Sequence, residues 1–173
     1  SSGLNFINPL VEVKRLDVKT QNYTMSGIHD EGAQSGDDAI RVLTSDGLEV
    51  TIDLTVLYKL LPSEAPRLLR ETGDDYTDKI VRPVTRTKIR DNSVYYEAIA
   101  LYSTKRDEFQ QRIFNSIDND FKKRGLILEQ LLVRNITLPQ SVKATIEQKI
   151  NAEQDAQKMQ FVLQKEKQEA ERK

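Results

Sequence analysis

Residues 49–60 read EVTIDLTVLYKL, a stretch in which every second residue is large and apolar. The apolar positions are Val50, Ile52, Leu54, Val56, Tyr58 and Leu60. Successive side chains of a strand point to opposite faces, so this period of two predicts a half-buried antiparallel strand. Ile40 to Thr44 precedes it across the turn sequence Ser45-Asp46-Gly47, and we expect the two segments to form a hairpin.

The chain before the hairpin carries a weaker strand pattern. Apolar residues between positions 10 and 18 suggest a first strand, in which the alternation slips between Val13 and Leu16 as at a β-bulge. Tyr23 and Met25 either extend this strand or begin the next one. Residues 26–38 are rich in Gly, Asp and Ser, a composition that is typical of a loop.

Two helices are expected directly after the hairpin. Pro62 ends the strand, and Ser63 is a candidate cap for a short helix that runs to about Glu71. A second helix is expected over residues 74–91. Pro83 predicts that this helix is kinked or begins later, because proline lacks the N–H that a helix interior requires.

A third helix is expected over residues 104–124, because large apolar residues recur there at every fourth position and form one stripe. The stripe consists of Phe109, Ile113, Ile117 and Phe121. Gly125 is a natural C-cap for this helix. Residues 126–138 then read as a strand with apolar side chains on both faces, which predicts that it is buried.

The last segment, residues 139–173, contains no Gly or Pro after Pro139 and is rich in Gln, Glu, Lys and Ala. These are good helix formers, so a long helix is expected, with Ser141 or a neighbour as its cap. Steps of four and three residues define a weak seam of the kind that pairs helices in coiled coils. The seam consists of Ala152, Ala156, Met159, Leu163, Glu166 and Ala170.

These elements predict an α+β fold, in which a twisted antiparallel sheet packs against helices over residues 4–138. The coiled-coil-like helix of residues 139–173 follows it. Residues 1–3, Ser-Ser-Gly, read as an expression-tag remnant, and both ends of the chain look cut. No run of 18 apolar residues occurs, so we expect this 173-residue piece to be soluble.

Composition argues against the common kinds of catalytic site. The chain has no cysteine, which excludes disulfides and thiolate chemistry, and its only histidine, His29, falls in the expected loop. Neither a Gly-x-Ser-x-Gly motif nor a phosphate-binding loop is present. We therefore expect no catalytic residue and no cofactor. With a net charge of -1, binding to nucleic acid is not expected either.

Two charged clusters remain. Asp74, Asp75 and Asp78 would suit a cation, but acids at a helix start that pair with Lys79 and Arg82 one turn later explain them better, so no metal is expected. A second cluster is a basic stripe spaced by four residues. Its members, Arg82, Arg86 and Arg90, either contact anionic lipid headgroups or simply complement the helix dipole.

The order of these elements, with several motifs, resembles the SPFH family of stomatins, prohibitins and flotillins. Gly3-Leu4-Asn5-Phe6-Ile7-Asn8-Pro9 is similar to the start of such domains, and Thr44-Ser45-Asp46-Gly47 to their hairpin. The stretches most similar to prohibitins are Leu61-Pro62, Gly73-Asp74-Asp75-Tyr76, Val81-Arg82-Pro83, Arg124-Gly125-Leu126-Ile127-Leu128 and Arg134-Asn135-Ile136-Thr137-Leu138-Pro139.

The resemblance implies a non-catalytic scaffold held at a membrane by an anchor upstream of Leu4. Relatives of this kind form homo-oligomeric rings or cages through the C-terminal helix, organise membrane microdomains and restrain membrane-bound AAA proteases. The seam residues are then the candidate oligomerisation surface. An alternative of a different class is a hydrolase or small-ligand-binding domain whose pocket the sequence does not reveal.

Overall fold

A computed structural model describes residues 3–4, 6, 8–27, 32–34 and 36–172 of the chain. His29, the only histidine, and part of the expected loop therefore lie outside the described residues. The helices and strands are β1 (Gln21–Met25), β2 (Ile40–Leu43), β3 (Glu49–Leu60), α1 (Ala65–Glu71), η2 (Thr77–Val81), α2 (Arg82–Ser93), η3 (Ala100–Thr104), α3 (Arg106–Lys123), β4 (Leu126–Thr137) and α4 (Gln140–Glu171), with a 3-10 turn, η1 (Pro62–Glu64), before α1.

The sheet is organised around β3, the strand with which the sequence analysis began. β4 pairs with β3 over nearly its whole length, from Thr51↔Thr137 to Leu60↔Leu126. Because one edge of β3 is thereby occupied, β1 and β2 lie end to end along its other edge, and every pairing is antiparallel. Val42 lies opposite Val50 in the β2–β3 hairpin, and Gly47 in its turn has φ 77°.

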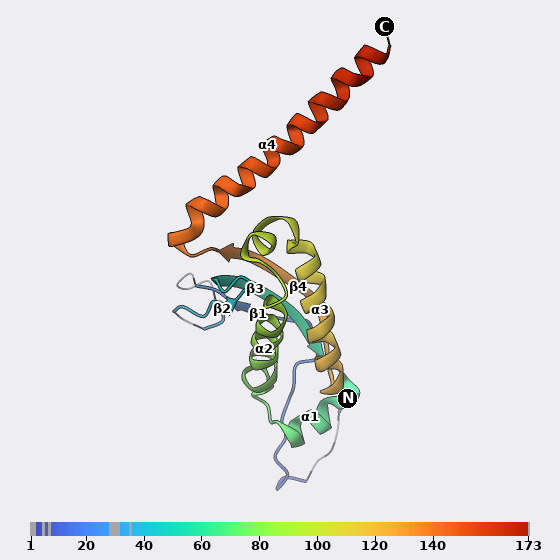
Figure 1. Cartoon of the computed structure of the whole chain (residues 1–173). Helices are drawn as coiled ribbons and strands as arrows, with labels where there is room; N and C mark the ends of the chain where they lie inside the picture. The colour runs from blue at the N-terminus through green and yellow to red at the C-terminus, as the bar shows by residue number, and fades with distance from the viewer. Residues whose placement is uncertain (1–2, 5, 7, 28–31, 35, 173) are drawn as a thin grey trace.

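The core lies between the sheet and the helices α2 and α3 (Figure 1). All six alternating apolar residues of β3 are at most 1% exposed, and so are the four residues of the α3 stripe. The rings of Tyr58 and Phe121 meet edge to face at 6.4 Å between centroids, which joins the two patterns directly. The predicted α+β class, with an antiparallel sheet packed on helices, is confirmed.

Several local expectations are confirmed as well. The β2–β3 hairpin, α3 and β4 lie within a residue or two of the predicted bounds. Gly125 follows α3 with φ 84°, as expected of a glycine that ends a helix. Its close contact with Glu64 adds a second constraint, because a Cβ at this position would lie 2.5 Å from the Glu64 Cβ.

The expected strand over residues 10–18 is wrong, since none of its residues is in a strand. Residues three apart point to opposite faces of a strand, so Val13 and Leu16 could not both reach one core. Only Leu16 packs against the core, while Leu10, Val11 and Val13 are exposed.

Three helices begin elsewhere than expected or without the expected cap. Residues 77–93 form a five-residue π-helix, η2, followed directly by α2, and Pro83 lies in the first turn of α2, which confirms the later start that Pro83 predicted as one of two alternatives. Proline is tolerated there because the first N–H groups of a helix have no partner within it. Neither Ser63 nor Ser141 acts as the expected cap, since α1 and α4 begin after Glu64 and Pro139 without a side-chain cap bond.

Candidate functional site

Helix α4 leaves the domain at the end of β4 and extends away from it (Figure 1). Its root is fixed by Ile146, which is 8% exposed, and by Val142 and Ile150, which pack against the core. The N–H groups of Val142 and Lys143 donate to the Pro139 carbonyl and close the first turn. From residue 151 to 172 every residue is exposed, so this part of α4 has no support from its own domain.

The predicted seam lies entirely on this unsupported part. The helix brings its members onto one face, where Met159 is 61% and Leu163 is 56% exposed. Ala152, Ala156, Glu166 and Ala170 are also exposed. Pairing of this face with another helix stays a prediction, because the structure holds a single chain.

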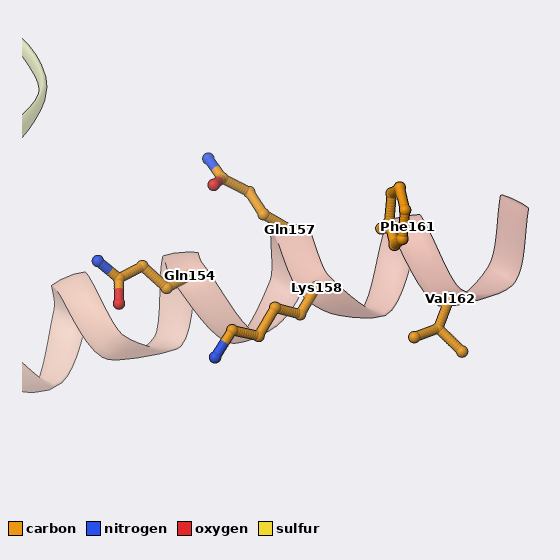
Figure 2. A pocket seen from close by; sticks show the side chains of 5 residues that line it. All are labelled: Gln154, Gln157, Lys158, Phe161 and Val162. Atoms are coloured by element: carbon orange, nitrogen blue, oxygen red, sulfur yellow. The ribbon is translucent and has the colours of Figure 1, made fainter. Parts of the chain in front are cut away.

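Two large apolar residues of α4 were missed by the sequence analysis. Phe161 is 69% and Val162 is 46% exposed. With Gln154, Gln157 and Lys158 they line a shallow groove along α4, in which Phe161 and Gln157 extend from one side of the ribbon (Figure 2). The seam pattern describes only one face of α4. Phe161 could have been found from its distance to Ile150, because eleven residues make about three turns and place both side chains on the same side of the helix.

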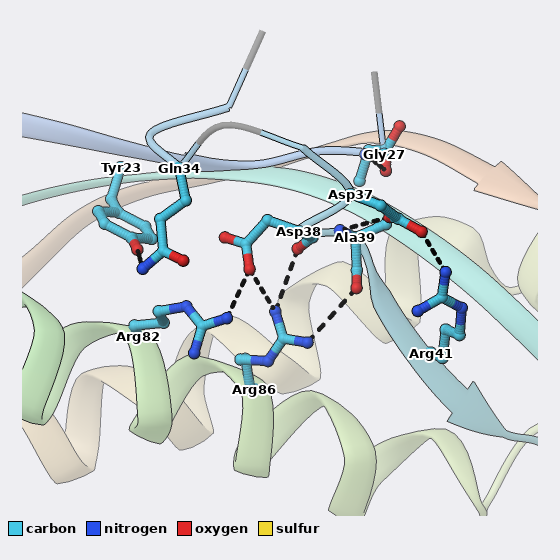
Figure 3. A network of polar contacts seen from close by, with 10 residues as sticks. Tyr23, Gly27, Gln34, Asp37, Asp38, Ala39, Arg41, Arg82 and Arg86 are labelled. Carbon is cyan, nitrogen blue, oxygen red and sulfur yellow. Dashed lines mark hydrogen bonds and ion pairs between the residues drawn. The ribbon is translucent and has the colours of Figure 1, made fainter. Parts of the chain in front are cut away.

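The three arginines of the predicted basic stripe do not share one environment, because two of them bind Asp38 and the third is exposed. Arg82 and Arg86 reach from α2 to Asp38, whose side chain is only 6% exposed (Figure 3). The Nη2 of Arg82 donates to the Asp38 Oδ1 at 2.5 Å, and the Nη1 of Arg86 donates to the Asp38 carbonyl at 3.1 Å. A further bond from Arg86 reaches the Ala39 carbonyl at 3.4 Å. We call Asp38, Arg82 and Arg86 the clasp.

The clasp joins the segment before β2 to α2. The hydrogen bond to Asp38 raises the pKa of Arg82, whereas burial, reinforced by the nearby Arg82 charge, lowers the pKa of Arg86. Arg90, the third member of the stripe, is exposed. Contact with lipid headgroups stays a prediction for all three arginines, and for Arg82 and Arg86 it would compete with the bonds to Asp38.

Of the acidic cluster at the start of η2, only Asp75 forms the local pair that the sequence predicted, while Asp74 lies 3.9 Å from Lys14. Asp75 Oδ1 lies 3.1 Å from Lys79 Nζ, as the spacing predicted, and this bond lowers the pKa of Asp75. Arg82, the expected partner of Asp78, is bound to Asp38 instead. Among the described residues, no group of three or more His, Cys, Asp or Glu side chains is placed to hold a metal ion.

The N-terminal segment lies at the end of the domain remote from α4, near α1 (Figure 1). Its first described apolar side chains face solvent, with Leu4, Phe6 and Leu10 between 85% and 95% exposed. Within the described residues, no helix combines the length and the apolar character that a membrane span requires.

Comparison with known proteins connects these features to one family. The sequence model described as "SPFH domain / Band 7 family" matches residues 1–173. Prohibitin 1 of Drosophila melanogaster is 25% identical over 122 residues, which cover 70% of this chain and 44% of that protein. Prohibitin-2 of Xenopus tropicalis is 27% identical over 124 residues, covering 72% and 41%.

Prohibitin-1 of Saccharomyces cerevisiae is similar to the same extent, at 25% identity over 126 residues, or 73% of this chain and 44% of the relative. The matched region therefore spans less than half the length of these relatives. A family match over the whole chain, together with the β3-centred sheet that packs on α2 and α3, gives one conclusion: the chain belongs to the SPFH domain / Band 7 family and is similar to its prohibitin members.

Proposed function

We propose that the protein is a membrane-associated scaffold that assembles with copies of itself through α4. Membership of the SPFH family supports a scaffold-type role at a membrane in general. The finer parts of the proposal are a ring- or cage-like assembly, the organisation of membrane microdomains and the regulation of a membrane-bound AAA protease. These parts are supported by the resemblance stated above.

The observation that carries the proposal is the exposure of α4. About twenty residues of this helix have no contact with the domain, and they present Met159, Phe161, Val162 and Leu163 to solvent. An isolated helix owes little of its stability to propensity alone and usually depends on packing of an apolar face. Exposed apolar surface of this kind marks an interaction site.

Attachment to a membrane is proposed through the N-terminal side of the domain. An anchor preceding Leu4 would hold the exposed apolar side chains of the N-terminal segment close to the lipid. Because that segment and α4 lie at opposite ends of the molecule, anchored copies would all direct α4 away from the membrane (Figure 1). Such tethering raises the effective concentration of the helices, so weak contacts suffice for assembly.

Replacing Leu163 with Lys tests self-assembly. The substitution places a charge on the seam, so we expect a loss of large species in sedimentation velocity while the domain stays folded. Gln160→Lys, with the same new charge between the two apolar faces, is the matched control and should assemble normally. An unchanged large species in Leu163→Lys would place the interface elsewhere.

The absence of enzymatic activity is a prediction of the same proposal. A screen of esterase, phosphatase, protease and nucleotidase substrates should show no turnover. A reproducible activity that one internal point mutation abolishes would favour the alternative of a hydrolase.

A further inference from the structure

Helix α4 has two apolar faces rather than one. An α-helix turns by about 100° per residue, so Phe161 lies roughly 160–200° around the axis from Met159 and Leu163. Ile150 lies on the same side as Phe161, since eleven residues make about three turns. Both faces are open to solvent over residues 156–163. One neighbouring helix could cover only one of them.

The two faces differ in shape. The first, which we call the Phe face, is dominated by the protruding ring of Phe161, with Gln157 and Gln154 beside it (Figure 2). The second, the Ala face, is the predicted seam, in which the small residues Ala152 and Ala156 lie next to Met159 and Leu163. A large side chain packs well into a surface of small ones, so the Phe face complements the Ala face better than it complements itself.

We infer that α4 packs front to back, with the Phe face of each copy against the Ala face of the next copy, in parallel and in register. This inference rests on the proposed self-assembly and specifies its geometry. In register, Phe161 of one copy lies level with Ala156, Met159 and Leu163 of its neighbour.

The charges on one flank of this contact are complementary. Beside the Phe face runs a basic row with a spacing of seven residues: Lys158, Lys165 and Arg172. At the edge of the Ala face, on the side that a parallel neighbour brings next to that row, are Asp155 and Glu166. Lys158 and Lys165 are each within three positions of one of these acids, or about 4.5 Å along the axis.

On the other flank the signs are exchanged, so that acidic residues lie beside the Phe face and basic residues beside the Ala face. Glu153 and Glu171 border the Phe face there, whereas Lys149 and Lys167 border the Ala face. Each Glu is four positions from a Lys of the neighbour, which is about one helical turn. Among the residues that the structure describes, the charges of both flanks form no ion pair with their own chain.

The competing geometry is a symmetric coiled coil with Ala face against Ala face. It would leave Phe161 exposed on the outside of the pair. It would also bring Glu166 against Glu166 of the partner at a seam position, where like charges repel. Front-to-back packing places Glu166 beside Lys165 instead. Such a heterologous contact leaves one free face at each end of a pair, so it continues to further copies and can close a ring.

Cysteine cross-linking distinguishes the two geometries, because the chain has no cysteine of its own. Gln157 borders the Phe face and Ala156 borders the Ala face, at nearly the same height and on the same side. Two proteins, Gln157→Cys and a size-tagged Ala156→Cys, would be mixed on vesicles that carry nickel-chelating lipid, each tethered by an added N-terminal His-tag. A short bis-maleimide should give the mixed adduct in excess over either self-adduct. Asn151→Cys, which lies between the faces, is the control and should give no adduct.

A charge exchange supplies an independent test. Lys165→Glu should weaken assembly on the vesicles about two- to five-fold per contact, as expected for an exposed pair. Combining it with Glu166→Lys should restore assembly, since the pair is then reversed. Circular dichroism of each variant would verify that α4 remains helical.

The outcomes separate the geometry from the proposed function. A self-adduct of Ala156→Cys without the mixed adduct would overturn front-to-back packing and leave self-assembly through α4 standing. No adduct in any mixture, with monomers at every concentration in sedimentation, would overturn both.

Discussion

Removing the Asp38 charge is expected to destabilise the domain more than a surface substitution would. In Asp38→Asn the side chain keeps its size but loses the charge that two guanidinium groups share, at 2.5 Å for Arg82 and 3.4 Å for Arg86. Those arginines are one turn apart on α2, so each would then face an uncompensated positive neighbour. The acid is 6% exposed, and water cannot replace it fully.

The magnitude follows from the burial of the three groups. Breaking a fully buried ion pair by removing one partner costs roughly 3–5 kcal/mol. The arginine side chains retain 29% and 22% exposure, so solvent compensates part of this loss. Arg86 also keeps its bonds to the Asp38 and Ala39 carbonyls. We therefore expect a decrease of about 2–3 kcal/mol in the free energy of unfolding.

Urea denaturation followed by circular dichroism would measure this decrease. Asp37→Asn is the matched control, because Asp37 is the adjacent residue and pairs with Arg41 at an exposed site. That pair should contribute at most about 1 kcal/mol. Equal stability of the two variants would refute the clasp. A double-mutant cycle of Asp38→Asn with Arg82→Met would then show no coupling.

Three further predictions concern the packing and the sheet. Phe121→Ala removes a side chain with no exposed surface, so thermal or urea unfolding should show a loss of about 3–5 kcal/mol, and an unchanged melt would mean that the α3 stripe is not buried. Gly125→Ala should cost about 1–3 kcal/mol in the same assay, because its φ is 84° and the new Cβ meets Glu64; wild-type stability would show that the turn is not as described. Thr20 Oγ1 donates a hydrogen bond to Glu129 at 2.7 Å, and this bond, together with Lys59, lowers the pKa of Glu129. The contribution of ionised Glu129 to stability is therefore present above the ordinary glutamate pKa and is lost as the pH falls through the lowered pKa. An NMR titration should therefore show the Glu129 pKa rising toward its ordinary value in Thr20→Ala, and an unaltered titration would exclude the bond.

The elements that the sequence predicted correctly are those in which the spacing of apolar residues matches the repeat of a strand or of a helix. The two-residue period of β3 and the four-residue spacing of α3 each define one complete buried face, so both could be placed before the structure was known. Residues 10–18 lack such agreement, because Val13 and Leu16 fall on opposite faces of a strand. Their apolar content alone could not show that only Leu16 reaches the core.

The clasp could not be predicted because its partners are distant in the sequence. Local spacing paired Arg82 with Asp78, one turn away, whereas the structure pairs it with Asp38, 44 positions earlier. Only the packing of α2 against β2 brings these residues together. Phe161 was missed for a different reason: it lies on the face of α4 opposite the seam, outside the pattern of steps of four and three residues.

The weakness of each α4 face is consistent with the assembly proposed for it. A seam with Ile or Val at every a position and leucine at every d position would pair the helices symmetrically in twos, and both partners would then have covered their strongest face. Here the Ala face holds only Met159 and Leu163 as large residues, and the Phe face holds Phe161, so neither face is strong enough to pair with itself. Unlike faces of this kind favour continued addition of copies over pairing, provided that a membrane keeps the copies parallel and close together. The low apolar content of α4 is then what allows many copies to join, rather than a sign that the helix has no partner.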